Sequence, residues 1–234
     1  MSLRRRLALL EWARQSGALI FEDDYDSEYR YIGRPIPALQ GLDQSGRVIF
    51  AGSFNAVLFP ALRLGYLVVP SEMVDVFAAA ASASTHHPPL LEQVILCDFI
   101  AEGHFARHIR RMRELYADRL DVLLDEAHKH LDGLMNISGV EAGLQTVGWI
   151  RTGADAEEIS ERLAGRNVEL TPLRHYAWGK AAGNTVILGF AAADARELRR
   201  GVQELARELE KSRKPERART NARRISQSDA DQSR

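Results

Sequence analysis

The chain has 234 residues, of which 45% are hydrophobic, and its formal net charge is −1. This length suits one or two globular domains, and the near-neutral charge gives no sign of nucleic acid or an anionic membrane as a partner. No run of about 20 apolar residues is present, so we expect no transmembrane helix. The single cysteine, Cys97, excludes an internal disulfide and favours a cytoplasmic location.

Helical and apolar segments alternate along the first seventy residues. Helical spacing of leucines over residues 3–15 predicts a helix that ends near Gly17. Apolar runs at 18–21, 48–52 and 64–69 predict three buried parallel strands.

Turn and capping signals divide the next part of the chain. Glycines and prolines over residues 33–41 predict a loop too rigid for a helix. Ser71 is placed to cap the following helix, and the proline pair 88–89 opens another that runs to about Ile100.

The remainder begins with one long helix, predicted by apolar spacing over residues 105–123, which would connect two lobes. Strand-like segments follow at about 135–140, 145–151 and 184–190, with a helix near 156–165. The last helix opens with Asp194 and Glu197, which have the spacing of a capping box. Residues 211–234 are basic and predict a disordered tail.

Polar groups lie next to each of the three predicted strands. Residues 22–31 follow the first strand, residues 52–60 follow the second, and residues 61–66 lead into the third. Ligands of open α/β sheets bind outside the carboxyl ends of strands. We therefore expect these groups to face one crevice.

Four phrases carry a specific resemblance: EDDYDSEYRY at 22–31, PALQGLD at 37–43, LFPALRLGYLV at 58–68 and FIAEGHFARHIRRMR at 99–113. Together they resemble the aminotransferase-like domain of MocR-type regulators, which join a GntR-type winged helix to a pyridoxal-phosphate fold of type I. The resemblance implies an α/β chain with the latter part of the large, pyridoxal-5′-phosphate (PLP)-binding domain at 1–104. A small α+β C-terminal domain would follow at 105–210, before the tail.

The resemblance also implies a PLP site. Asp23 matches the acid that pairs with the pyridine nitrogen, and Tyr25 matches the tyrosine that bonds the phenolate oxygen. Ser53 and Arg63 match phosphate ligands, a role that suits a hydroxyl donor and a guanidinium. Each has a plainer reading: a loop cap for Asp23, a core aromatic for Tyr25, a turn residue for Ser53 and an ion pair with a local acid for Arg63.

The pattern departs from the family at the cofactor anchor. The family phrase Gly-Thr-Phe-Ser-Lys-Thr-Leu-Phe-Pro matches residues 52–60, where this chain has Asn55, Ala56 and Val57. Ala56 therefore occupies the position of the Schiff-base lysine, and alanine supplies neither the amine nor the base that transamination needs. We expect no catalytic residue, weak or no PLP binding, and no covalent bond to the cofactor.

Other features of the sequence concern the extent of the domain and the binding of substrate, metal and DNA. The family's domain begins well before residue 3, so we interpret the chain as truncated, and Arg174 is a candidate for binding a substrate carboxylate. His104 and His108 have i, i+4 spacing, but no third metal ligand is evident, which favours a structural role. No helix-turn-helix segment is found, so we expect no DNA-binding domain in this chain.

Two functional hypotheses follow. The first is an inactive, regulator-type PLP domain that forms a homodimer and responds to a small amino-acid or amine effector, with no membrane partner. The alternative is an aminotransferase fragment that works only with a partner chain. Ala56 separates them, since a partner would have to supply the missing amine.

Overall fold

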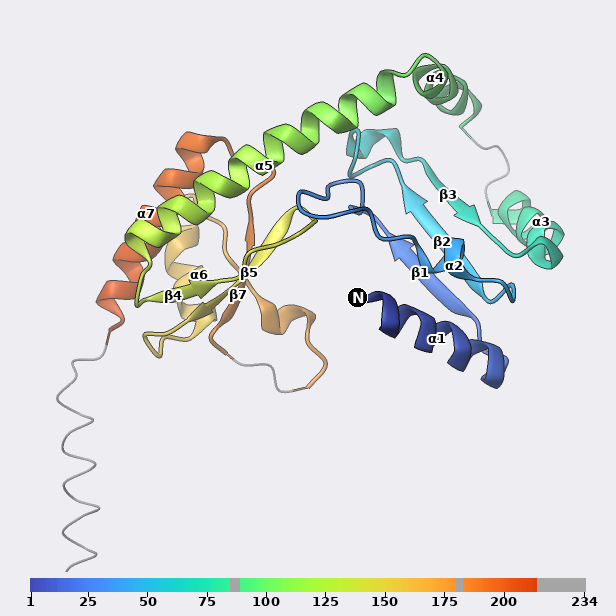
Figure 1. The fold of residues 1–234 in the computed structure, drawn as a ribbon. Coiled ribbons are helices and arrows are strands. Elements are labelled where there is room, and N and C mark those ends of the chain that lie inside the picture. The colour runs from blue at the N-terminus through green and yellow to red at the C-terminus, as the bar shows by residue number, and fades with distance from the viewer. Residues whose placement is uncertain (85–88, 180–182, 214–234) are drawn as a thin grey trace, which may run out of the picture. The chain divides into compact units, whose positions relative to one another are not determined.

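The computed structural model describes residues 1–84, 89–179 and 183–213 and divides the chain into two compact units (Figure 1). The first unit contains Met1–Leu115 and Glu141–Gly143, and the second contains the rest. Among the described residues, no helix is long and apolar enough to cross a membrane. Most of the predicted tail, from residue 214 onward, lies outside the described residues.

The first unit is built on a three-stranded sheet. Strand β1 (Ile20–Asp24) pairs in parallel with β2 (Val48–Ser53), and β2 pairs with β3 (Gly65–Val68). The third strand is antiparallel and exposed along its whole length, so the prediction of a buried parallel strand is wrong for it. For β1 only the parallel direction is confirmed, because none of its residues is buried, and β2 is buried only at Val48 and Ile49. The short connection through the 3₁₀ helix η1 (Pro60–Leu62) explains the direction of β3, because a parallel return needs a crossover of a dozen or more residues.

Helix α1 (Leu3–Ser16) ends where the sequence predicts, with Gly17 in the left-handed conformation that terminates many helices. Its residue Leu10 packs with Leu39 and Val48 in a small core. This cluster holds α1 against the sheet.

A four-residue helix, α2 (Leu39–Leu42), occupies the end of the predicted rigid loop, so that prediction is wrong at this point. The reason is a distant cap: the Glu22 carboxylate accepts hydrogen bonds from the backbone of Leu39 at 2.8 Å and of Gln40 at 3.0 Å. Glu22 also pairs with Arg6 at 3.3 Å. A carboxylate at a helix start satisfies amide groups that have no intrahelical partner.

Three helices follow the sheet. A 3₁₀ turn, η2 (Ser71–Met73), leads into α3 (Val74–Ser84). The N-cap of η2 is Pro70, and Ser71 is the first residue of the turn, so the prediction that Ser71 caps the helix is wrong. Helix α4 (Leu90–Ala101) begins after Pro89 as expected. The long helix α5 (His104–His130) begins in the first unit and ends in the second.

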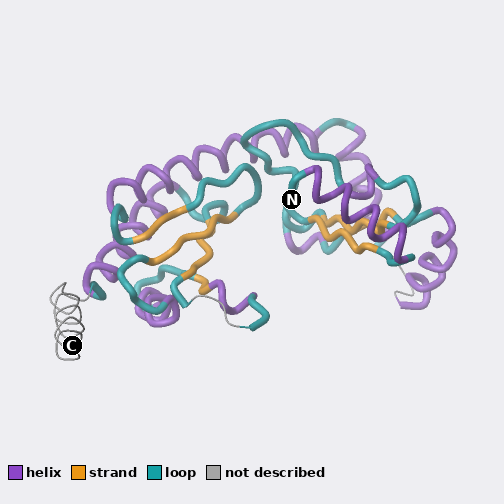
Figure 2. Tube along the Cα trace, turned by 60° about the horizontal axis from the view of Figure 1, so that its bottom comes forward, coloured by secondary structure: helices purple, strands orange, loops and turns teal. Residues whose placement is uncertain are grey.

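The second unit contains a four-stranded sheet in the order β4-β5-β7-β6, with antiparallel pairs throughout. Figure 2 draws strands in orange. The strands of this sheet are β4 (Met135–Ile137), β5 (Gln145–Ile150), β6 (Thr171–Pro172) and β7 (Thr185–Gly189). The sequence predicted all but the two-residue β6, after which the chain forms a 3₁₀ turn, η3 (Leu173–Tyr176).

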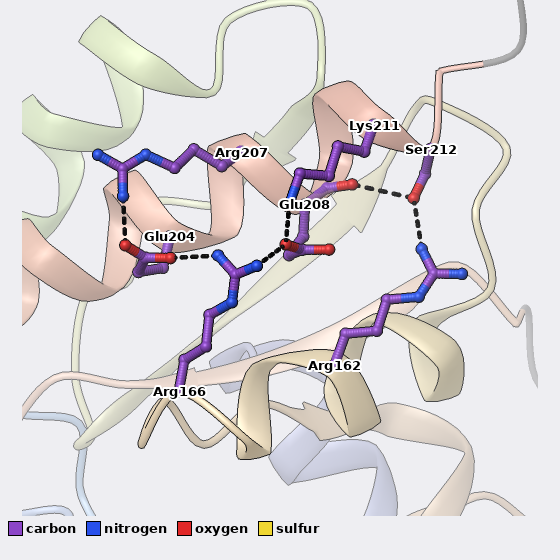
Figure 3. A network of polar contacts seen from close by, with 7 residues as sticks. All are labelled: Arg162, Arg166, Glu204, Arg207, Glu208, Lys211 and Ser212. Carbon is purple, nitrogen blue, oxygen red and sulfur yellow. Dashed lines mark hydrogen bonds and ion pairs between the residues drawn. The ribbon is translucent and has the colours of Figure 1, made fainter.

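Helices α6 (Ala156–Ala164) and α7 (Ala195–Lys211) complete the second unit. The predicted capping box is confirmed. The Asp194 side chain accepts a hydrogen bond from the Glu197 backbone, and the Glu197 carboxylate accepts one from the Asp194 backbone N–H at 2.8 Å. Figure 3 shows how α7 is joined to the residues that follow α6. Arg166 reaches Glu204 at 2.5 Å and the buried Glu208 at 2.6 Å, and Lys211 pairs with Glu208 at 2.9 Å.

Candidate functional site

The four predicted site residues lie at one end of the three-stranded sheet. Asp23 is in β1, opposite Ala51, and Tyr25 follows the end of that strand. Ser53 ends β2 and stands opposite Gly65, two residues after Arg63. Strand pairing therefore brings Asp23, Ser53 and the start of β3 to neighbouring positions.

Asp23 and Tyr25 are open to solvent. The Asp23 side chain is exposed and forms no hydrogen bond or ion pair within the described part of the chain, so it does not cap a loop. Tyr25 is 51% exposed, which excludes a core aromatic in this chain. The neighbouring Asp24 has the capping role instead, since it accepts from the Ser27 backbone at 3.1 Å.

Ser53 and Arg63 lie on either side of the loop between β2 and β3. The Ser53 hydroxyl oxygen accepts a hydrogen bond from the Asn55 backbone at 3.2 Å, so Ser53 does shape a turn, while its own hydrogen is free to donate. Arg63 is exposed, has no ion pair among the described residues and adopts the left-handed conformation, with φ at 54°. A non-glycine residue in this conformation is uncommon. The turn thus carries an unpaired cation.

The loop that holds Ala56 is fixed from two directions. The carbonyl oxygen of Val57, a residue only 1% exposed, lies 2.9 Å from Nε2 of His108 and accepts from the buried Tyr29 hydroxyl at 3.3 Å. At the base of the loop, the Phe54 backbone donates to Leu64 at 3.0 Å. Ala56 therefore sits in a constrained turn.

Two further contacts define this loop. A Cβ atom at Gly52 would lie 2.3 Å from Cζ of Tyr66, so the tyrosine ring packs where only glycine leaves room. The side-chain oxygen of Asn55 is buried and has no hydrogen-bond partner among the described residues. Such an acceptor costs free energy until a donor satisfies it.

The electrostatic environment of this end of the sheet is negative. Burial raises the pKa of Glu28, and the charges of Asp24 and Asp26 raise it further. Burial also raises the pKa of Tyr66, with additional contributions from Glu28 and Asp24. Both groups therefore resist ionisation because of burial and the acids around them.

The segment after β1 is held by distant parts of the first unit. Arg113 of α5 donates to the Glu28 carbonyl at 2.8 and 3.1 Å, and Arg30 pairs with Glu141 at 2.6 Å. The Tyr31 hydroxyl donates to Gly143 at 2.7 Å. These contacts fix the position of residues 28–31. This segment contains Tyr29, whose hydroxyl donates to the Val57 carbonyl oxygen.

No lysine occurs in the first unit. The chain has four lysines. Lys129 and Lys211 belong to the second unit and pair with glutamates at 3.0 and 2.9 Å, whereas Lys180 and Lys214 lie outside the described residues. The described lysines are thus engaged in ion pairs.

Arg174, the candidate for a substrate carboxylate, is also engaged. It bonds Glu157 at 2.6 Å and Asp155 at 3.4 Å, and His175 adds a contact to Glu157 at 3.0 Å. Burial acts to raise the pKa of Glu157, but the bonds from Arg174 and His175 lower it overall. A substrate would have to compete with this ion pair.

The histidines and the second unit offer no better site. His108 bonds the Val57 carbonyl, which supports the structural role expected for it, and His104 pairs with Glu102 at 3.1 Å. Within the described ranges, no cluster of three or more metal-ligating side chains occurs. A cavity of about 480 Å³ in the second unit is lined mainly by residues of β7, of α7 and of the segment 167–171, and it contains none of the four predicted residues.

Sequence reasoning missed the hydrogen bond of Tyr29 and the burial of the Asn55 side-chain oxygen. Tyr29 stands in the phrase at 22–31, but its bond to Val57 spans 28 residues, and no local pattern predicts it. Asn55 was noticed as a departure from the family phrase, which was the available signal.

Comparisons with known proteins agree on fold and family. No model of a protein family matches the chain. The probable rhizopine catabolism regulatory protein MocR of Rhizobium meliloti is 42% identical over 205 residues, which are 88% of this chain and 42% of that protein. The chain therefore spans less than half of this relative.

Solved aminotransferases match the chain in structure. The kynurenine aminotransferase of Pyrococcus horikoshii, solved in complex with PMP, aligns with a TM-score of 0.84 and 26% identity over 92% of this chain and 53% of its own. The α-aminoadipate aminotransferase LysN of Thermus thermophilus was solved in complex with N-(5′-phosphopyridoxyl)-L-leucine. It aligns with a TM-score of 0.81 and 25% identity over 90% of this chain and 55% of its own. These matches confirm a mixed α/β class I aminotransferase fold, of which the chain covers about half. The chain is homologous to the aminotransferase-like domain of the MocR-type, GntR-family regulators.

Proposed function

We propose that the chain is a ligand-binding, catalytically inactive aminotransferase-like domain of a MocR-type regulator, which takes a PLP-type ligand weakly and without a covalent bond. Ala56 carries the proposal. It stands 33 residues after Asp23, in a loop whose neighbouring polar groups suit the cofactor while its own side chain has no amine.

The residues present fit two ends of the cofactor. Asp23 offers an exposed, unpaired carboxylate for a protonated pyridine nitrogen, and Tyr25 offers a hydroxyl for the phenolate oxygen. Arg63 and Ser53 offer a guanidinium and a hydroxyl for the phosphate. When bound in enzymes of this fold, PLP supplies an electron sink for carbanion chemistry.

The aldehyde end does not fit. The first unit contains no lysine, and the described lysines are paired with glutamates in the second unit. Without an amine beside Ala56, this site can neither capture the aldehyde nor move a proton at the substrate α-carbon. The side chains therefore support binding and orientation only. We further propose a cytoplasmic homodimer that responds to an amino acid or amine.

An aminotransferase fragment that needs a partner chain is the second candidate. It is favoured by the exposure of α4, where Leu96 is the only buried residue of the helix. Such a partner would still have to place an amine beside Ala56. We therefore rank this candidate below an inactive domain.

Equilibrium dialysis of the whole chain against pyridoxamine 5′-phosphate tests the proposed site. Asp23→Asn and Arg63→Gln should each weaken binding about ten-fold, the effect of one lost charge-assisted contact. Asp132→Asn and Arg5→Gln, two exposed positions away from the loop, should leave binding unchanged. Equal binding by all four variants would place the ligand elsewhere and overturn the proposal.

A further inference from the structure

The form of ligand that suits this site can be inferred from its charges and from Ala56, an inference that rests on the proposed function. In a lysine-containing site, the aldehyde of PLP gains a covalent bond to the protein. Residue 56 has only a methyl group, and no lysine is present in the first unit. Without that covalent bond, a ligand with an aldehyde at this carbon has no gain in affinity over a ligand with another group there.

The charges around the loop favour a cation at that carbon. Five acidic residues stand within 22–28. Of these, Glu22 is paired with Arg6 and Asp23 is assigned to the pyridine nitrogen, whereas Asp24 has no ion pair among the described residues. Arg113 contacts the Glu28 carbonyl oxygen, and burial raises the pKa of the Glu28 carboxyl group, so this acid adds less negative charge than Asp24. An ammonium group near these acids gains Coulomb energy that a neutral aldehyde or alcohol does not.

Asn55 adds an acceptor beside Ala56. Its side-chain oxygen is buried without a hydrogen-bond donor among the described residues, and its backbone N–H is held by Ser53 at 3.2 Å. Rotation of the side-chain amide would present this oxygen to a donor delivered next to Ala56. An ammonium group supplies three such donors, whereas an aldehyde supplies none.

We propose that this site selects pyridoxamine 5′-phosphate, the amine form of the cofactor, over the aldehyde PLP, with Asn55 as an acceptor for the amine. Binding is reversible, and no bond to the protein forms. Arg63 and Ser53 hold the phosphate that all forms share, so selection depends on the group at the 4′ carbon.

Calorimetric titration of the whole chain with three ligands tests this selection. The ligands are pyridoxamine 5′-phosphate, pyridoxine 5′-phosphate and PLP, which carry an amine, an alcohol and an aldehyde at the same position. The amine form should bind about ten-fold more tightly than the other two, the effect of one favourable charge interaction. Inorganic phosphate should compete weakly with all three.

Variants separate the contributions. Asn55→Leu should reduce the preference for the amine over the alcohol several-fold and keep the affinity for the alcohol. The substitution removes a buried unsatisfied group, so we expect the variant to fold. Asn136→Leu, at an exposed position of β4, should leave the preference unchanged.

The outcomes distinguish this inference from the proposed function. Equal affinity for the three ligands, with binding still sensitive to Asp23→Asn and Arg63→Gln, would overturn the selection and leave the proposed site intact. Tightest binding of PLP would also overturn the selection. Binding of none of the three would overturn the proposed function and the selection together.

Discussion

Nε2 of His108 lies 2.9 Å from the carbonyl oxygen of Val57, the residue that follows Ala56. A carbonyl oxygen only accepts, so Nε2 carries the hydrogen in this contact. The buried Tyr29 hydroxyl donates to the same oxygen at 3.3 Å. The loop that holds Ala56 thus has a backbone fixed by two hydrogen bonds to the residue that follows it.

Removing one of these donors should destabilise the chain. Tyr29→Phe keeps the buried ring and deletes the hydroxyl, so the free energy of unfolding should fall by about 1 kcal/mol, the net value of one hydrogen bond. Urea unfolding monitored by circular dichroism measures the change. Tyr176→Phe, at an exposed position of η3, should have no effect, and a similar loss in both variants would contradict the role of the Tyr29 hydroxyl.

Gly52 should not tolerate a side chain. A Cβ atom there would lie 2.3 Å from the Tyr66 ring, so Gly52→Ala must displace the ring and should lower the free energy of unfolding by about 1–3 kcal/mol. Gly189→Ala at the end of β7 meets nothing within 4 Å and is the matched control. If Tyr66→Ala fails to relieve the loss in the double variant, the clash is not its cause.

The network around Glu208 should give the second unit an acid-sensitive stability. Hydrogen bonding to Lys211 and the charge of Arg166 lower the pKa of Glu208 below its unfolded value. Its contribution is therefore present above about pH 4.3, the unfolded pKa, and is lost as the pH falls through the folded pKa. Solvent reaches both cations and screens them, so Glu208→Gln should cost about 1 kcal/mol at pH 7.

Urea midpoints at pH 7 and pH 3.5 check this expectation. The difference between the native chain and Glu208→Gln should shrink at the lower pH, because pH 3.5 lies below the unfolded pKa of glutamate and the unfolded chain then takes up a proton that the folded carboxylate resists. Glu210→Gln, an exposed neighbour on α7, should behave as the native chain at both values. An undiminished difference at pH 3.5 would show that the carboxylate charge is not responsible.

Much of the fold is predictable from local sequence. The ends of α1, the capping box of α7 and the existence of one long helix at α5 follow from spacing and from residues at helix ends, although α5 extends to His130, beyond the predicted spacing at 105–123. The direction of β3 and the exposure of β1 and β3 did not follow, because an apolar run alone does not indicate which strand it pairs with or which residues cover it. Helix α2 was missed because its cap, Glu22, is distant in sequence.

Only part of the candidate site could be predicted from the sequence. Sequence phrases named Asp23, Tyr25, Ser53 and Arg63, and strand pairing places their segments at one end of the sheet. The bonds to the Val57 carbonyl join residues 28 and 51 positions apart. Contacts of that separation depend on the folded chain and leave no local pattern.

Restoring the amine alone should not restore catalysis. Ala56→Lys supplies a side chain that can capture PLP, but the chain covers only 53% of the aminotransferase that it matches. We expect a PLP adduct on Lys at this position and no measurable transfer between amino and keto acids. Coupled assays with several amino donors check this, and turnover above the rate of free PLP would show that the present residues suffice.

Mass spectrometry after borohydride reduction tests the central claim most directly. The native chain is incubated with PLP, reduced, and analysed intact and as peptides. We predict only scattered, substoichiometric labelling of the four lysines, because Ala56 offers no amine. One phosphopyridoxyl group per chain on a single lysine would contradict the account.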